Sequence, residues 1–232
     1  MKLSRFCIFF CLPPIFVNLY AIFNNIEWLA RISEISIFIP LLIGFSKMLD
    51  FRDINISAFI TLTILAILLR YFKNISFIYF LSIFLNMFSY TFLIREALRY
   101  TYRETGNKFM LFFFFLLISG NAYFGFLHLQ ELEVHMNGMI EFTFYLIYYL
   151  NLLIFVIVGL IYYLNSYSRK SVYFIAMMMA LVVSDILRDM VLFYFPDTSV
   201  LLLQHFLSLS AIILAFQFFT TKERKLRLIN LI

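Results

Sequence analysis

The stretch 139–164 reads MIEFTFYLIYYLNLLIFVIVGLIYYL and contains a single charged residue, Glu141, close to its beginning. A helix needs about 20 predominantly apolar residues to cross the roughly 30 Å hydrocarbon core of a bilayer. Within lipid, a lone segment satisfies its own backbone N–H and C=O groups only as a helix. The stretch therefore predicts a transmembrane α-helix.

Seven other stretches have the same character, so we predict eight membrane spans. Hydrophobic residues make up 64% of the chain and charged residues 13%, whereas soluble domains carry about 25% charged residues. The mean hydropathy is +0.95. We therefore predict an all-α polytopic transmembrane helix bundle, a single integral membrane domain over residues 1–232. The predicted spans cover residues 6–23, 30–47, 54–71, 74–95, 108–127, 139–164, 171–195 and 198–220.

The basic residues indicate how this bundle is oriented. If the N-terminus is cytoplasmic, 14 of the 18 Lys and Arg residues fall in cytoplasmic segments and 3 in external ones, while Arg188 lies within a span. Cytoplasmic loops carry an excess of Lys and Arg. We expect both termini in the cytoplasm and the protein in a bacterial inner membrane. The net charge of +5 reflects this orientation, so no nucleic-acid partner is expected.

Two loops carry patterns that could bind a ligand. Arg95, Arg99 and Arg103 recur every four residues, which suits either a lipid-phosphate or partner contact or, as we favour, ordinary snorkelling at the interface. His128, Glu131 and His135 would share one helix face and could bind a metal, although a solvated acidic turn is the simpler interpretation. We predict no metal site and no cofactor.

The densest polar cluster inside a predicted span is Ser184-Asp185-Ile186-Leu187-Arg188-Asp189. Charges within the membrane are costly and are functional candidates by default. Asp185, Arg188 and Asp189 fall at i, i+3 and i+4, so one helix face carries all three. Two interpretations stay open: an ion-paired ridge that holds this span to a neighbour, or part of an active or transport site.

Other polar residues within the spans fall in the external half by the helical rise of about 1.5 Å per residue. Together they predict a polar pocket that opens outward or sideways. We predict further that Asn86, Ser89 and Tyr90 make interhelical hydrogen bonds, and that the tyrosines of 145–149 face lipid or the interface. The residues assigned to the pocket, beside the cluster, are Arg70, Asn121, Glu141, Gln204 and His205.

The stretch Ala176–Phe195 with its Ser184-Asp185 pair, the short Pro196-Asp197 loop and a final span resembles the YhhN family of integral membrane proteins. Pro40-Leu41 resembles a second family segment less closely. The family includes lysoplasmalogenases, which hydrolyse the vinyl-ether bond of lyso-ether lipids with intramembrane carboxylates. The resemblance implies that Asp185 is the surviving acid.

The chain departs from that pattern at several positions. Arg70 stands where the family has an acid, and Phe206 and Ser210 replace an expected Tyr and Gln. Two functions follow as hypotheses: a lyso-ether-lipid hydrolase or an impaired relative, or a non-enzymatic membrane subunit that binds lipid or packs against partner proteins.

In the hydrolase, Asp185 would donate the proton, helped by Asp189 and His205. The binding residues would be Arg70, Arg188, Gln204, Asn121 and Glu141. We also predict that Arg70 pairs with Asp185 or Asp189. The alternative is that Arg70 snorkels to the interface with Lys73.

Overall fold

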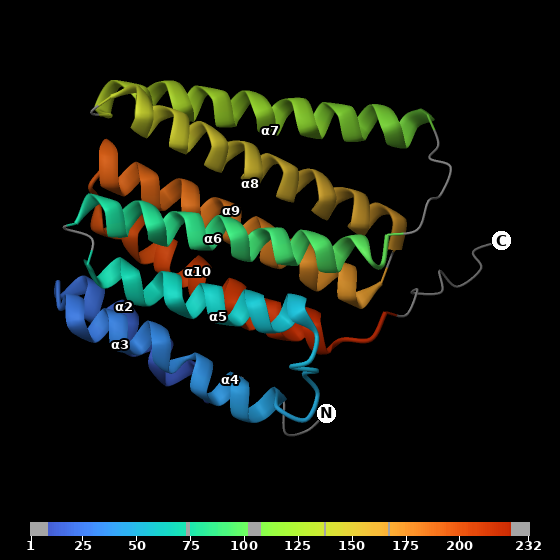
Figure 1. Ribbon diagram of the computed structural model, residues 1–232, viewed down its shortest axis with the longest axis horizontal. Coiled ribbons are helices and arrows are strands. Elements are labelled where there is room, and N and C mark those ends of the chain that lie inside the picture. Colours follow the sequence, from blue (N-terminus) through green and yellow to red (C-terminus); the bar gives the residue numbers. More distant parts are fainter. Residues whose placement is uncertain (1–8, 73–74, 102–107, 137, 167, 224–232) are drawn as a thin grey trace.

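The computed structural model describes residues 9–72, 75–101, 108–136, 138–166 and 168–223 as a bundle of long helices that run side by side (Figure 1). All the regular elements of these described residues are helices, which confirms the predicted all-α class. The elements of the described residues are α2 (Leu12–Phe23), α3 (Glu27–Ser36), α4 (Phe38–Phe45), α5 (Ile54–Leu69), the 3₁₀ turn η1 (Arg70–Phe72), α6 (Ser76–Leu98), α7 (Lys108–His135), α8 (Met139–Ser166), α9 (Arg169–Phe193) and α10 (Thr198–Thr220).

α4 continues α3 in the same direction, and the other successive helices run in opposite directions, so the connections alternate between the two ends of the bundle (Figure 1). The turns at residues 24–26 and 194–197 lie at one end. The segment 46–53, the end of α6 and the end of α10 lie at the other. We call these the turn end and the tail end of the bundle.

Five helical segments of the described chain are long and apolar enough to cross a membrane. This finding identifies a helical membrane protein, and it matches five of the eight predicted spans. The spans predicted at 6–23, 108–127 and 171–195 stay predictions. The five segments are Glu27–Phe45, Ile54–Phe72, Ser76–Leu98, Met139–Ser166 and Thr198–Thr220.

One predicted boundary stays a prediction and one is wrong. α2 begins at Leu12, with Pro13 and Pro14 in its first turn, where the missing N–H of proline does no harm, and the predicted start of this span at residue 6 is not tested. Residues 6–8 lie outside the described part. α7 continues to His135 and does not end at 127, so the loop predicted from His128 onward is helical.

The joint between α5 and α6 is a true connection and not a kink in one helix. After η1, the N–H of Ile75 donates to the carbonyl of Phe72 at 3.0 Å. α5 and α6 then lie side by side in the bundle (Figure 1). The chain therefore reverses here, as two separate spans require.

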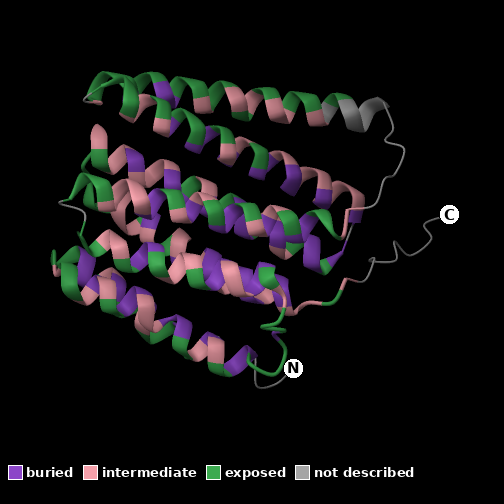
Figure 2. Ribbon diagram, viewed as in Figure 1, coloured by how far each residue is buried: buried purple, intermediate pink, exposed green. Residues whose placement is uncertain are grey.

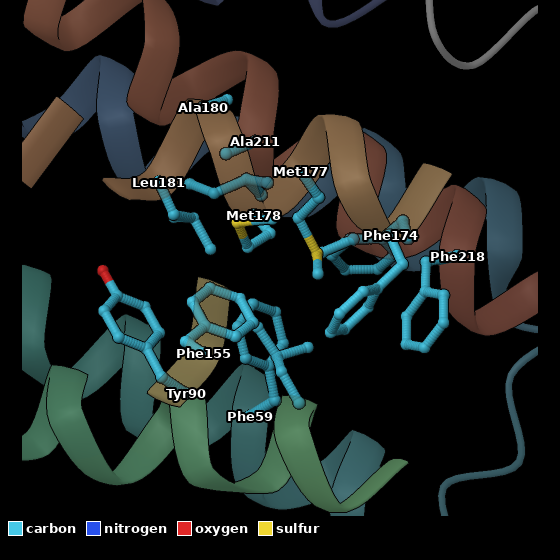
Figure 3. Packing of buried hydrophobic residues seen from close by; sticks show 14 of the residues in the cluster. Phe59, Tyr90, Phe155, Phe174, Met177, Met178, Ala180, Leu181, Ala211 and Phe218 are labelled. Carbon is cyan, nitrogen blue, oxygen red and sulfur yellow. The ribbon is translucent and has the colours of Figure 1, made fainter. Parts of the chain in front are cut away.

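The core of the described helices is apolar and aromatic (Figure 3). The ring of Tyr90 on α6 stacks on Phe155 of α8 with centroids 5.4 Å apart. Phe174 packs against Phe218 at 4.9 Å. Burial is greatest among the central helices, whereas α7 is exposed along most of its described length (Figure 2). Since α7 packs mainly against α8, it forms one edge of the bundle.

Candidate functional site

The charged cluster of α9 lies buried inside the bundle and is ion-paired on its own helix. Arg188 donates from Nη1 to Asp185 Oδ1 at 2.8 Å and from Nε to Asp189 Oδ1 at 2.9 Å. Asp189 is fully buried and Asp185 is 6% exposed. The predicted i, i+3, i+4 arrangement is therefore present, with Arg188 between the two carboxylates.

Three tyrosines from neighbouring helices complete the cluster. Tyr90 of α6 and Tyr148 of α8 donate their hydroxyls to Asp185 Oδ2 at 2.6 and 2.5 Å. Tyr149 of α8 donates to Asp189 Oδ2 at 2.9 Å. Each carboxylate thus accepts hydrogen bonds from Arg188 and from at least one tyrosine.

These contacts correct part of the sequence interpretation. Tyr145, Tyr148 and Tyr149 are buried and do not face lipid. Their i, i+3, i+4 spacing marks one face of α8, and this was the signal available in the sequence. The interhelical bond predicted for Tyr90 is confirmed, but the hydroxyl of Ser89 donates within its own helix, to the carbonyl of Asn86 at 2.7 Å.

Arg70 does not form the predicted ion pair with α9. Its Nη1 lies 3.9 Å from Oε1 of Glu34 on α3. The Arg70 side chain is 15% exposed and that of Glu34 is 2% exposed. The prediction failed because α3 presents a buried carboxylate to η1, while Asp185 and Asp189 already share Arg188. The predicted alternative with Lys73 lies outside the described residues.

Arg70 and Asp185 nevertheless line the same small cavity, of about 20 Å³. Ser184 and Gln204 also line it, and the Ser184 hydroxyl donates to the backbone carbonyl of Gln204 at 3.0 Å. Three of the predicted pocket residues, Arg70, Asp185 and Gln204, therefore line one cavity. It encloses a space far smaller than a lipid.

The remaining predicted residues lie at other places. His205 lines a different cavity, of about 160 Å³, together with Arg31. Glu141 lines a hollow of about 510 Å³ beside Phe80. Asn121 lines a groove of about 460 Å³. The polar residues therefore serve several cavities and not one pocket.

The groove of Asn121 lies along the α7–α8 hairpin, and we call it the α7–α8 groove. Its walls are mostly apolar, and its polar members besides Asn121 are His128 and Tyr149. His128 Nδ1 lies 2.8 Å from the hydroxyl of Tyr194, and its ring centroid lies 5.3 Å from that of Tyr149. Tyr149, which lines the groove, also donates a hydrogen bond to Asp189, so the groove adjoins the α9 cluster.

The candidate metal ligands His128, Glu131 and His135 lie on a helix, as the pattern required, but they do not form a group that could hold a metal ion. His135 Nδ1 lies 3.0 Å from the backbone oxygen of Glu131, and His128 is engaged with Tyr194. Within the described ranges, no three His, Cys, Asp or Glu residues are grouped so that they could hold a metal ion.

A second charged network, which the sequence did not reveal, lies at the tail end of the bundle. Glu96 of α6 accepts from Asn55 Nδ2 at 2.8 Å and from Arg99 Nη1 at 2.9 Å. Lys170 Nζ lies 3.7 Å from Glu96 and 3.6 Å from the ring centroid of Tyr100. This network ties α5, α6 and α9 together.

Arg99 is therefore engaged with protein, contrary to the snorkelling we predicted. It also pairs with Asp53, and this hydrogen bond raises the pKa of Arg99. Burial raises the pKa of the neighbouring Tyr100 to about 12. Arg95 is exposed, and Arg103 lies outside the described residues.

The comparisons with known proteins add no relative to this geometry. No protein-family model, no curated protein and no solved structure matches the chain. The resemblance to the YhhN family stays a prediction that rests on Ser184-Asp185 and the order of the spans, and the function has to be argued from the helical membrane bundle itself.

Proposed function

We propose that this helical membrane protein is non-enzymatic and binds the acyl chain of a membrane phospholipid in the α7–α8 groove. The observation that carries the proposal is the groove itself, a space of about 460 Å³ with mostly apolar walls. It lies beside α7, the most exposed helix of the bundle. In a bilayer this edge of the bundle faces lipid, so an acyl chain reaches the groove from the side.

The side chains around the groove support an apolar occupant. Phe124 and Phe126 on α7 and Leu150 on α8 line it and are exposed. Ligand sites are mostly apolar with a few placed polar groups, and here Asn121 and His128 are those groups. Both lie on one face of α7, seven residues apart, which is about 10.5 Å along the helix axis.

The α9 cluster supports a structural role better than an acid catalyst. Vinyl-ether hydrolysis would need Asp185 to donate a proton to a bound lipid. Asp185 instead accepts from Arg188, Tyr90 and Tyr148. The cavity at Asp185 measures about 20 Å³, which leaves no room for a lipid. The lipid-sized groove is lined by Tyr149 and not by Asp185.

A pair of matched variants tests the groove. Gly125 lines it and Gly120 does not. A Cβ added at either glycine of α7 meets no heavy atom within 4 Å. Gly125→Phe should fill the groove, whereas Gly120→Phe changes α7 to a similar degree elsewhere. The probe is a phosphatidylcholine with a photoactivatable acyl chain, incorporated into phosphatidylethanolamine–phosphatidylglycerol nanodiscs.

The wild type and Gly120→Phe should crosslink the chain to α7 and α8 peptides, and Gly125→Phe should lose most of that labelling. Equal labelling of all three proteins would show that the α7–α8 groove is not the binding site of the acyl chain. Incubation with lysoplasmalogen tests the hydrolase hypothesis directly. We expect no turnover, and turnover that disappears in Asp185→Asn would overturn the non-enzymatic proposal.

A further inference from the structure

We infer that a single water molecule binds inside the bundle, in the 20 Å³ cavity enclosed by α5, α6, α9 and α10. The cavity is lined by Thr63 and Ile67 of α5, Asn86 and Tyr90 of α6, and residues of α9 and α10. A site needs roughly 10–15 Å³ of this kind of volume to hold one water, and two to four polar partners. The space suits one water and excludes a larger ligand.

The walls supply those partners. Thr63 Oγ1 is buried and has no hydrogen-bond partner among the described residues. The α9 and α10 side of the same cavity is lined by Ser184, Gln204 and the carboxylic residue Asp185. A buried hydroxyl left unpaired is costly in free energy, and a water between Thr63 and the opposite wall removes that cost.

The charges around the cavity favour water over a cation. Arg70 lines it, and Arg188 donates to Asp185 at 2.8 Å. Each carboxylate near the cavity already has a guanidinium partner, because Glu34 pairs with Arg70 and both Asp185 and Asp189 pair with Arg188, so no carboxylate is left unpaired for a further cation. A neutral molecule that both donates and accepts hydrogen bonds fits both the carboxylate and the Thr63 hydroxyl.

Such a water would connect the two ion-paired groups of the bundle. Arg70, which pairs with Glu34 of α3, stands on one side of the cavity, and Asp185 of the α9 cluster stands on the other. Water-mediated hydrogen bonds are nearly as favourable in enthalpy as direct ones. The water would therefore extend the polar network from α3 to α9.

Thermal unfolding of the detergent-solubilised protein tests this inference, because a bound water and a dry cavity predict different changes in the Tm of one variant. Thr63→Val keeps the side-chain shape and removes the hydroxyl. If water is bound, the variant loses a hydrogen bond, and the Tm should fall by about 2–4 °C, the shift expected for a loss of that size in a chain of this length. If the cavity is dry, the variant removes an unpaired polar group and the Tm should stay or rise, which would overturn the inference.

The control is Thr61→Val on the same helix, at an exposed position, which should leave the Tm unchanged. A repeat in sodium, potassium and choline chloride separates water from a cation. Equal Tm values in the three salts support water, and a stabilisation specific to one metal ion would replace it with that ion. A high-resolution density map of the wild type should show a single peak within hydrogen-bond distance of Thr63 Oγ1.

Discussion

Arg188 holds two carboxylates inside the bundle, and three hydroxyl groups complete their coordination. Two interpretations of this cluster were open from the sequence, an ion-paired ridge and a reactive site. Hydrogen bonds from α6 and α8 favour the ridge, because they engage the carboxylates in contacts between helices. The cluster therefore connects α6, α8 and α9 through hydrogen bonds between their side chains.

Removal of Arg188 should therefore be severe. Arg188→Met leaves two buried carboxylates without their cation, and breaking a buried ion pair from one side costs about 3–5 kcal/mol. Equilibrium unfolding in mixed micelles measures the loss. Arg95→Met is the control, because Arg95 is exposed and such changes are usually within about 0.5 kcal/mol.

The triple variant Asp185→Asn, Arg188→Met, Asp189→Asn removes all three charges at once. It should recover much of the stability lost in Arg188→Met, because no uncompensated charge remains buried. A triple variant as unstable as the single one would contradict this expectation and show that the charged side chains themselves are needed for stability.

Among the helices, α10 and α7 show what sequence patterns reveal and what they miss. The predicted boundaries of α10 are correct, because Asp197 caps the helix by accepting from the backbone N–H groups of Ser199 at 2.7 Å and Val200 at 3.3 Å. The predicted end of α7 at residue 127 was wrong, because the polar residues that follow were interpreted as a loop, whereas they continue the helix to His135.

The Asp197 cap gives the start of α10 a pH dependence. The two backbone hydrogen bonds lower the pKa of this carboxyl below its usual value of 3.8. Its stabilising contribution is therefore complete above about pH 4 and is lost as the pH falls through the lowered pKa. Hydrogen exchange of the Ser199 and Val200 amides should accelerate, relative to reference amides, on acidification through this range.

Asp197→Asn provides the matched control for that experiment. Asparagine also caps helices but does not titrate, so the acid-induced acceleration at Ser199 and Val200 should disappear. The same acceleration in the variant would assign the effect to another group.

The packing of α8 against α9 is a third feature of the helices. A Cβ at Gly159 would lie 2.8 Å from Cε of Met178, so the glycine permits close approach. Gly159→Val should lower the unfolding free energy by about 1–3 kcal/mol, the usual cost of overpacking. Gly120→Val, where a Cβ has open space, is the control, and equal losses in the two variants would show that the effect does not come from the contact between α8 and α9.

For the whole molecule, composition and hydrophobic length were enough to predict a membrane bundle of antiparallel helices. The contacts within one helix, such as Asp185 with Arg188, follow from spacing alone. The contacts between residues of different helices could not be predicted, because the spacing of residues within one segment does not say which helices are neighbours. The pair of Arg70 with Glu34 and the tyrosines around Asp185 are therefore results of packing.

The orientation of the bundle remains a proposal with a direct test. The connections between the described helices alternate between the two ends of the bundle (Figure 1), and the predicted topology has both termini on the same side of the membrane. We propose from the excess of Lys and Arg that this side is cytoplasmic. Reporter fusions after Lys222 should be active as cytoplasmic fusions, and fusions in the turn at residues 194–197 as external ones. The opposite pattern would reverse the orientation.

The α9 cluster carries one positive and two negative charges, a net charge of −1 in its ionised form. Asp189 lies four residues before the end of α9, about 6 Å from that end, which is external in the proposed orientation. A membrane potential of 100 mV, negative inside, changes the energy of a unit charge by about 2.3 kcal/mol across the full bilayer. An anionic cluster near the outer surface lies at the favourable side of that field, so the voltage of an energised membrane would help to hold α9 in place and its collapse would loosen it.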